Sequence, residues 1–101
     1  MQRIIYKKIM AYNLLKGKRG IIFGALNNMS IAWKVAERCA EEGAKIVLSN
    51  TEMALRMGEL NELSDKINAP IIAADATNYD DLENVFVKAQ DVLGGKVDFV
   101  L

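Results

Sequence analysis

The chain has 101 residues, which is enough for about one small domain with a single core. Its 51% hydrophobic and 26% charged residues favour a folded chain over a disordered one, and thirteen basic residues balance thirteen acidic ones. This balance argues against a nucleic-acid-binding or anionic-membrane surface, and the lack of histidine argues against metal chemistry and histidine-dependent triads.

Positive and negative charges are distributed unevenly between the first nine residues and the rest of the chain. Arg3, Lys7 and Lys8 give them a charge of +3 without an acid, and the remaining chain carries −3. They lack the apolar core of about 7 to 15 residues and the cleavage site of a secretory signal. We interpret residues 1–9 as a basic leader or upstream extension, and we expect residues 10–101 to form the folded unit.

The sequence predicts a soluble protein of a reducing compartment. No stretch approaches the roughly 18 consecutive apolar residues of a membrane span, so we expect no membrane association. Cys39 is the only cysteine, which excludes an internal disulfide and fits the cytoplasm. Because Cys39 lies on the apolar stripe of a predicted helix and has no histidine to activate it, we interpret it as a packing residue.

The first predicted elements are a strand and a helix joined by a short loop. The stretch "RGIIFG", residues 19–24, is typical of a strand buried on both faces and ends at Gly24. Beyond the loop, Ser30 is a good N-cap and Gly43 a good stop. Between them, apolar residues recur with helical spacing, which predicts one buried helix face: Ile31, Ala32, Val35, Ala36, Cys39 and Ala40.

The same alternation repeats along the chain. Residues 45–49 and 71–74 are apolar runs that predict strands, and residues 97–101 begin a fourth. One helix is predicted between the second and third strands, from a spacing of three and four: Met53, Met57, Leu60, Leu63 and Ile67. Another is predicted within residues 77–93, with cap candidates Thr77 and Asn78 at its start and Gly94 and Gly95 after it.

Strands that alternate with helices through short connections predict an α/β fold with a parallel sheet. We expect a Rossmann-type doubly wound sheet in a three-layer αβα arrangement. The fourth strand has no helix after it, although a parallel sheet normally has both faces covered. We therefore expect the fold to be truncated after this strand, as in the amino-terminal half of a longer domain.

The first strand-to-helix turn has the order of a nucleotide-binding turn but only one of its glycines. In the T-G-x-x-x-G-x-G pattern the later glycines would fall on Asn28 and Ser30. Asparagine tolerates a left-handed backbone, and Ser30 can offer its hydroxyl and amide to a phosphate while capping the helix. An ordinary strand-to-helix loop, as in flavodoxin-like or receiver-like domains, remains the alternative.

Asp75 directly follows the third predicted strand. It either ends that strand as a simple loop residue or contributes to a ligand site, because open α/β sheets bind ligands at the carboxyl ends of their strands. At that edge the carboxylate can accept a hydrogen bond from an adenine amino group, and the Ala76 amide can reach the ring.

The segment "LLKGKRGIIFGALNNMSIAWKVAERCAEEGAKIVLSN", followed by "ADATN", resembles the amino-terminal half of the bacterial enoyl-[acyl-carrier-protein] reductases. Its specific element is a single glycine, five residues, and then Ser-Ile-Ala before Trp33. This glycine-poor form separates the family from most other short-chain dehydrogenases/reductases. The resemblance runs from about Leu14 to the end of the chain.

The resemblance implies a cytoplasmic, homotetrameric enzyme that uses NADH to reduce the trans-2 double bond of an acyl chain on acyl carrier protein. It assigns the pyrophosphate to Gly24, Ser30 and Ile31, and the adenosine ribose to Thr51. Many members have glutamine at the latter position, so Thr51 is a departure. Adenine maps onto the pair after the third strand: Asp75 and Ala76.

The family's catalytic tyrosine and lysine, six residues apart, map beyond Leu101, together with a second tyrosine upstream of them. The tyrosines of this chain lie elsewhere and match none of these positions: Tyr6, Tyr12 and Tyr79. We therefore assign no catalytic residue and no metal ligand within the chain, and we expect the chain alone to be inactive.

The loop "ALNNM" has no base, and Glu52 follows the second strand, so the sequence favours NADH over NADPH. Arg56 is the only candidate for a 2′-phosphate. Two alternatives stay open: another short-chain reductase, such as a 3-oxoacyl reductase with three residues between its tyrosine and lysine, or a non-catalytic NAD(P)-binding domain.

Overall fold

A computed structural model describes residues 12–101, so the predicted leader, which contains Tyr6, and the first two residues of the expected folded unit lie outside the described residues. The elements in chain order are β1 (Arg19–Phe23), α2 (Ile31–Glu41), β2 (Lys45–Asn50), α3 (Glu52–Met57), α4 (Leu60–Ile67), β3 (Ile71–Ala73), α5 (Tyr79–Leu93) and β4 (Phe99–Val100). None of the helices in this part of the chain is long and apolar enough to span a bilayer.

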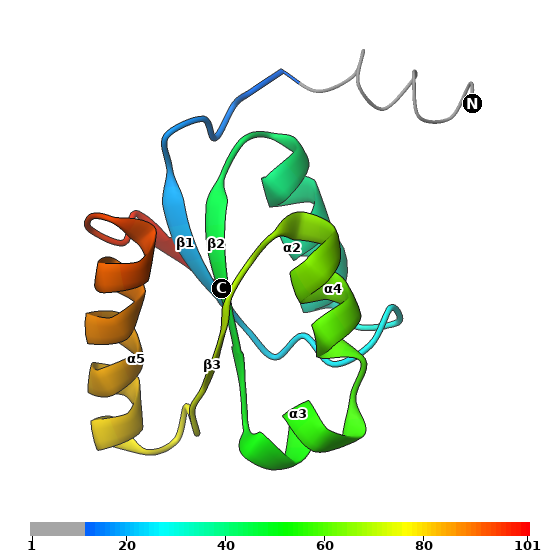
Figure 1. Cartoon of the computed structure of the whole chain (residues 1–101), viewed down its shortest axis with the longest axis vertical. Coiled ribbons are helices and arrows are strands. Elements are labelled where there is room, and N and C mark those ends of the chain that lie inside the picture. The colour runs from blue at the N-terminus through cyan, green and yellow to red at the C-terminus, as the bar shows by residue number, and fades with distance from the viewer. Residues whose placement is uncertain (1–11) are drawn as a thin grey trace.

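The four strands form one parallel sheet in the order β3-β2-β1-β4 (Figure 1). β1 pairs with β2 over its whole length, from Arg19 opposite Lys45 to Phe23 opposite Ser49. β4 pairs with the other side of β1, where Gly20 lies opposite Phe99. A Cβ atom on Gly20 would lie 2.2 Å from the Phe99 ring, so only glycine leaves room for that ring. This strand order is the one the Rossmann prediction requires.

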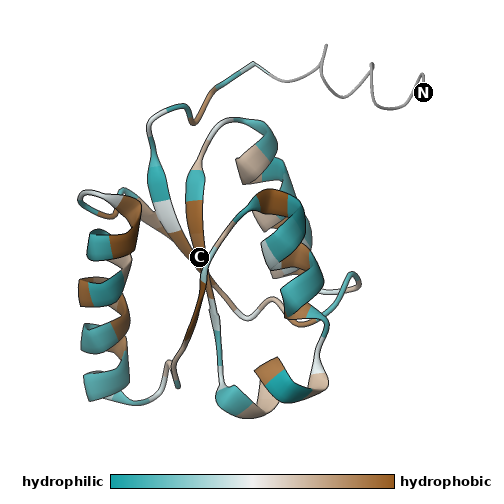
Figure 2. Cartoon of the chain, viewed as in Figure 1, coloured by the Kyte–Doolittle hydropathy of each residue, from teal (hydrophilic) through white to brown (hydrophobic). Residues whose placement is uncertain are grey.

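Helices cover both faces of the sheet, which confirms the three-layer αβα prediction. α2 and α4 lie on one face and α5 on the other (Figure 1). Ile22 and Leu48 contribute to the core under α2 and α4, and Ile21 and Val47 to the core under α5. The apolar sides of the helices face the sheet (Figure 2). The alternation along β1 and β2 explains why both strands read as unbroken apolar runs.

The single helix predicted over residues 53–67 is wrong, because the chain breaks into α3 and α4 at Gly58. Gly58 has an extended backbone, with φ −96° and ψ −175°. Leu60 and Leu63 are buried as predicted, but Met53 is 65% and Met57 79% exposed. α3 therefore does not continue the buried stripe of α4.

The longest helix, α5, begins and ends as its sequence predicts. The Asn78 side chain accepts a hydrogen bond from the Asp81 amide at 3.0 Å and caps the amino terminus. Gly94 ends the helix in a left-handed conformation, with φ +77°. These signals are local in the sequence, which is why the bounds of α5 follow from it so closely.

Candidate functional site

The carboxyl ends of the parallel strands deliver the predicted site residues to one edge of the sheet. Gly24 directly follows β1, Thr51 directly follows β2, and Asp75 lies two residues beyond β3. Because the strands are parallel and in register, these ends meet at the same edge. This is the edge where open α/β sheets bind their ligands.

Gly24 makes the turn out of β1 with a positive φ of +88°. Its amide donates a hydrogen bond to the Ser49 carbonyl oxygen at 3.0 Å, which keeps the turn attached to β2. No atom lies within 4 Å of the place a Cβ would take. Glycine is therefore required here by backbone conformation and not by crowding, and the space beside the turn is open.

Ser30 occupies the N-cap position of α2, but its side chain does not cap the helix. The hydroxyl donates to the Asn27 carbonyl oxygen at 2.8 Å and accepts from the Leu26 amide at 3.2 Å. The Ser30 amide also donates to the Asn27 carbonyl oxygen, at 3.0 Å. The prediction of a serine cap is therefore wrong in its side-chain contact, because Ser30 closes a turn of the loop instead. The first-turn amides of α2 consequently keep no side-chain partner from Ser30.

Asn28 does not take the left-handed conformation that its glycine-like position predicted. Among the described non-glycine residues only Asn13 and Asn68 have a positive φ. The tight turn is made instead by Asn27, whose side-chain oxygen accepts from the Met29 amide at 2.9 Å. Two side chains, those of Asn27 and Ser30, thus shape a loop that glycines shape in the standard pattern.

Ile31, the first residue of α2, is 82% exposed, although its spacing placed it on the buried face. Ile31 is not among the residues that pack against the core under α2, so helical spacing alone did not determine its burial. Trp33 and Ala36, further along the same helix, are buried. Cys39 packs against this core, and its burial raises the pKa of the thiol.

Thr51 caps α3, and its oxygen accepts a hydrogen bond from the Ala54 amide at 3.2 Å. Its hydroxyl proton is not used in this contact, so it can still donate to a ligand. The preceding residue, Asn50, was not identified from the sequence. Its Nδ2 donates to the Ala25 carbonyl oxygen at 3.0 Å, and its Oδ1 accepts from the Thr51 amide at 2.8 Å. The position of Asn50, between the end of a predicted strand and a residue expected at the binding edge, was the only sequence signal for its role.

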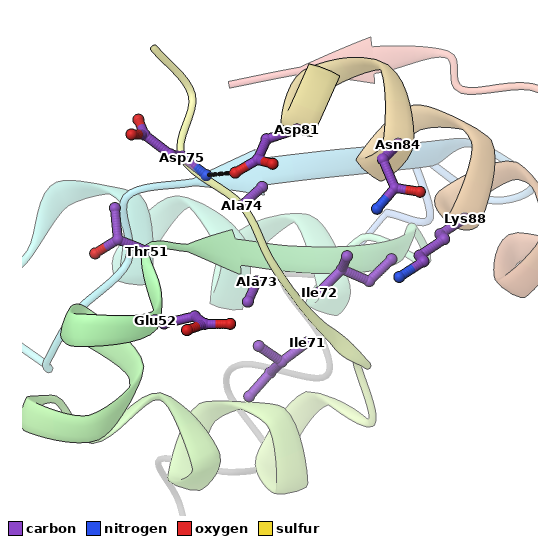
Figure 3. A pocket seen from close by; sticks show the side chains of 10 residues that line it. All are labelled: Thr51, Glu52, Ile71, Ile72, Ala73, Ala74, Asp75, Asp81, Asn84 and Lys88. Atoms are coloured by element: carbon purple, nitrogen blue, oxygen red, sulfur yellow. Dashed lines mark hydrogen bonds between the residues drawn. The ribbon is translucent and has the colours of Figure 1, made fainter. Parts of the chain in front are cut away.

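Asp75 is exposed and held by its neighbours after β3. Its Oδ1 accepts from both the amide and the hydroxyl of Thr77, at 2.9 and 2.6 Å, and these hydrogen bonds hold the pKa of the carboxyl below its ordinary value. Its own amide donates to Asp81 Oδ2 at 2.9 Å (Figure 3). The other carboxylate oxygen points away from Asp81 and can accept from a ligand. The next residue, Ala76, is also exposed.

A pocket of about 750 Å³ runs along the outer edge of β3 and contains part of this site. Figure 3 shows Thr51 and Glu52 on one side of it, and Asp81, Asn84 and Lys88 of α5 on the other. The predicted adenosine residues Thr51 and Asp75 therefore share one pocket. The remaining predicted residues, Gly24, Ser30, Ile31 and Ala76, do not line it.

These features suit a dinucleotide that spans the sheet edge. Gly24 provides a turn with open space beside it, and the loop leads into the amino terminus of α2, whose first-turn amides are not capped by the Ser30 side chain and where a phosphate is favoured. Exposed hydrogen-bonding groups follow β2 and β3 for the adenosine end. Arg56, the predicted candidate for a 2′-phosphate, is exposed on α3 and does not line the pocket, where Lys88 is the base.

Comparison with known proteins agrees with this geometry. Residues 24–101 match the family model described as "Enoyl-(Acyl carrier protein) reductase". The chain is 38% identical to "Enoyl-[acyl-carrier-protein] reductase [NADH] 1" of Rhizobium meliloti (strain 1021), over 90% of this chain and 33% of that protein. It is 32% identical to "Enoyl-[acyl-carrier-protein] reductase [NADH] FabI" of Rickettsia bellii (strain RML369-C), over 91% of this chain and 35% of that protein.

Solved structures give the same result. The FabI–NADH complex from Alistipes finegoldii is 58% identical with a TM-score of 0.86, over 88% of this chain and 31% of that one. An enoyl-(acyl-carrier-protein) reductase from Anaplasma phagocytophilum in complex with NAD is 26% identical with a TM-score of 0.75, over 86% of this chain and 33% of that one. The chain spans about a third of the length of the curated relatives it matches.

Proposed function

The chain belongs to the enoyl-(acyl carrier protein) reductase family, and from this premise we propose that it binds NADH as the dinucleotide-binding part of a reductase of trans-2-enoyl chains carried on acyl carrier protein. NADH supplies the hydride for this reduction when it is bound. The residues of this chain hold and orient the dinucleotide. The observation that carries the proposal is the positive-φ turn at Gly24, which leads into the amino terminus of α2 at the ligand-binding edge of the sheet.

In this proposal the pyrophosphate lies against Gly24 and the first turn of α2. Backbone amides and the positive end of the helix dipole stabilise its charge there. Gly24 lets the backbone approach closely, because it carries no Cβ. Ser30 keeps the loop in shape through its contacts with Leu26 and Asn27, and the Ile31 amide is one of the first-turn donors.

The adenosine end lies beyond β2 and β3. The Thr51 hydroxyl donates to a ribose hydroxyl while its oxygen keeps the cap of α3. The free carboxylate oxygen of Asp75 accepts from the adenine amino group, and the Ala76 amide donates to the ring. The hydrogen bonds from the Thr77 hydroxyl and amide orient this carboxylate for that contact.

The charges around this end favour NADH over NADPH. Glu52 directly follows Thr51, and Asp75 and Asp81 line the same pocket. A 2′-phosphate would add two negative charges near three carboxylates, which is unfavourable at close range. Lys88 is the single base of that pocket.

The remaining features of the proposal follow from membership in the family. The substrate is an enoyl chain on acyl carrier protein, the working form is a homotetramer, and the compartment is the cytoplasm. The relatives support this substrate, since they are named as enoyl-[acyl-carrier-protein] reductases. The catalytic tyrosine and lysine of the family match no residue of this chain.

Calorimetric titration of NADH into the chain tests the binding proposal. We expect saturable binding of NADH and weaker binding of NADPH. Ser30→Ala should raise the Kd for NADH by about ten- to thirtyfold, because the loop loses both hydroxyl contacts, each worth on the order of 1 kcal/mol. Ser64→Ala is the matched control, since Ser64 lies on α4 and bonds to Ala69. Unchanged NADH affinity in Ser30→Ala would overturn the assignment of the loop.

The reaction is tested on the protein as its gene encodes it, from first to last codon. We expect NADH absorbance to fall when a trans-2-enoyl-acyl carrier protein is added. Consumption with a 3-oxoacyl substrate instead would place the protein among the 3-oxoacyl reductases. Binding of NADH without turnover of either substrate would indicate a non-catalytic NAD-binding domain.

A further inference from the structure

The loop between β1 and α2 is held by hydrogen bonds from the end of β2 and from the segment that follows it. Asn50, the last residue of β2, places its carboxamide between two backbone groups: Nδ2 donates to the Ala25 carbonyl oxygen at 3.0 Å, and Oδ1 accepts from the Thr51 amide at 2.8 Å. A carbonyl accepts only and an amide donates only, so these partners fix the orientation of the carboxamide. Asn50 thus joins the first residue after Gly24 to the residue that caps α3.

A second contact holds the next loop residue. The Glu59 amide donates to the Leu26 carbonyl oxygen at 2.9 Å. This approach is possible because Gly58 has no side chain: a Cβ there would lie 2.6 Å from both the carbonyl oxygen and the Cδ1 atom of Leu26. The break between α3 and α4, which the sequence did not predict, is therefore the place where the connection between β2 and β3 contacts the loop after β1.

The two contacts are connected through α3 and form a closed ring of hydrogen bonds. Thr51 caps the helix through the Ala54 amide, and the Ala54 carbonyl oxygen accepts from the Gly58 amide at 2.8 Å. Figure 1 shows α3 at the same end of the sheet as the loop after β1. The backbone from Ala25 to Leu26 closes the ring. The ring therefore sets the position of the loop relative to Thr51, while the cap of α3 is held by contacts of its own.

We propose that Asn50 and Gly58 are positioning residues for the dinucleotide: they hold the loop after β1 at the distance from Thr51 that lets one NADH molecule contact both ends. The proposal rests on the proposed NADH function. Neither residue is assigned a ligand contact, and both act through carbonyl groups of the loop. Loss of either contact should weaken the binding of the pyrophosphate more than the binding of adenosine.

The test uses the variants Asn50→Asp and Gly58→Ala in the full chain. Asn50→Asp keeps the acceptor for the Thr51 amide but places a carboxylate oxygen against the Ala25 carbonyl oxygen, so only the loop contact is lost. Gly58→Ala displaces Leu26. Gln90→Glu, an exposed amide-to-acid change on α5, is the control for added charge. Affinities for NADH, ADP-ribose and adenosine are measured by NMR titration, and exchange of the loop amides is measured without ligand.

We expect Asn50→Asp to raise the Kd for NADH and ADP-ribose about five- to tenfold and to leave the Kd for adenosine within about twofold, as loss of one net hydrogen bond predicts. The amides of Leu26, Met29 and Ser30 should exchange faster without ligand, while Gln90→Glu matches the parent chain. Equal weakening for all three ligands, or unchanged loop exchange, would overturn the positioning role.

The ligand-free exchange separates this inference from the function on which it rests. If the parent chain binds no NADH but Asn50→Asp accelerates exchange in the loop, the proposed function fails and the bracing of the loop stands. If the parent chain binds NADH and Asn50→Asp binds it equally well, the function stands and the positioning role fails. Gly58→Ala repeats the test at the contact between Glu59 and Leu26. If its Kd for NADH is also unchanged, neither residue positions the loop for the dinucleotide.

Discussion

Ser49 provides a test of the packing at the centre of the sheet. It is completely buried, and within residues 12–101 its hydroxyl oxygen has no hydrogen-bond partner. It lies opposite Phe23 on β1 and Ile72 on β3, on the side of β2 that also carries the buried Val47. A buried hydroxyl among apolar neighbours cannot exchange its lost water contacts for protein contacts, so removing it, which leaves a methyl side chain, should stabilise the fold.

The magnitude follows from two opposing terms. An unsatisfied buried polar group costs about 1 to 3 kcal/mol. Removal of one oxygen atom forfeits a few dispersion contacts of about 0.1 to 0.2 kcal/mol each, or roughly 0.5 kcal/mol in sum. We therefore expect Ser49→Ala to raise the free energy of unfolding by about 1 to 2 kcal/mol. For a chain of this length, that corresponds to a rise in Tm of about 4 °C or more.

Urea unfolding followed by circular dichroism measures this change, and a thermal scan checks it. Ser64→Ala is the matched control, because the Ser64 hydroxyl donates to the Ala69 carbonyl oxygen at 2.5 Å. Its removal should lower the free energy of unfolding by about 1 kcal/mol. If Ser49→Ala destabilises the chain as much as Ser64→Ala does, the hydroxyl of Ser49 is satisfied in solution and the reasoning is refuted.

Two further predictions concern the contact between β1 and β4 and the adenosine end of the site. Gly20→Ala brings a Cβ within 2.2 Å of the Phe99 ring, so it should lower the free energy of unfolding by about 1 to 3 kcal/mol. Urea titration measures this change, and an unchanged unfolding midpoint would show that the ring moves aside freely. Thr77→Val removes the hydroxyl that donates to Asp75 and should raise the pKa of that carboxyl, followed by NMR pH titration. The pKa of Asp75 is lower in the folded chain than its ordinary value. The contact with Thr77 therefore stabilises the fold at pH values above the ordinary carboxyl pKa, and this stabilisation disappears as the pH falls through the folded-state pKa. An unshifted Asp75 titration in Thr77→Val would contradict the assigned cause.

The parts of the fold that were predictable from the sequence are those with local signals. β1 and β2 are buried on both faces, so Ile21, Ile22, Val47 and Leu48 produce continuous apolar runs. The ends of α5 follow from Asn78 and Gly94, whose effects depend on their own backbone. The positions of Gly24, Thr51 and Asp75 at one edge follow from a parallel sheet alone, because every strand delivers its carboxyl end there.

The parts that could not be predicted depend on contacts between distant residues. The spacing from Met53 to Ile67 passes through Gly58 without a break in period, and only the approach of Leu26 shows why the helix stops there. Asn50 looks like an ordinary strand end until Ala25 is placed beside it. Asn28 and Ser30 were given the roles of the glycines they replace, whereas the turn depends on Asn27, whose side-chain bond to the Met29 amide no spacing rule identifies.

The position of β1 in the middle of the sheet also determines the order in which the chain can assemble. Its pairing with β2 closes a loop that contains one helix, whereas its pairing with β4 must wait for two more strands and three more helices to be synthesised. Short loops close at a lower entropic cost, so β1, β2 and β3 should associate first. Until Phe99 arrives beside Gly20, the second side of β1 is an open hydrogen-bonding edge, and the growing chain is most exposed to misassociation with other chains during that interval.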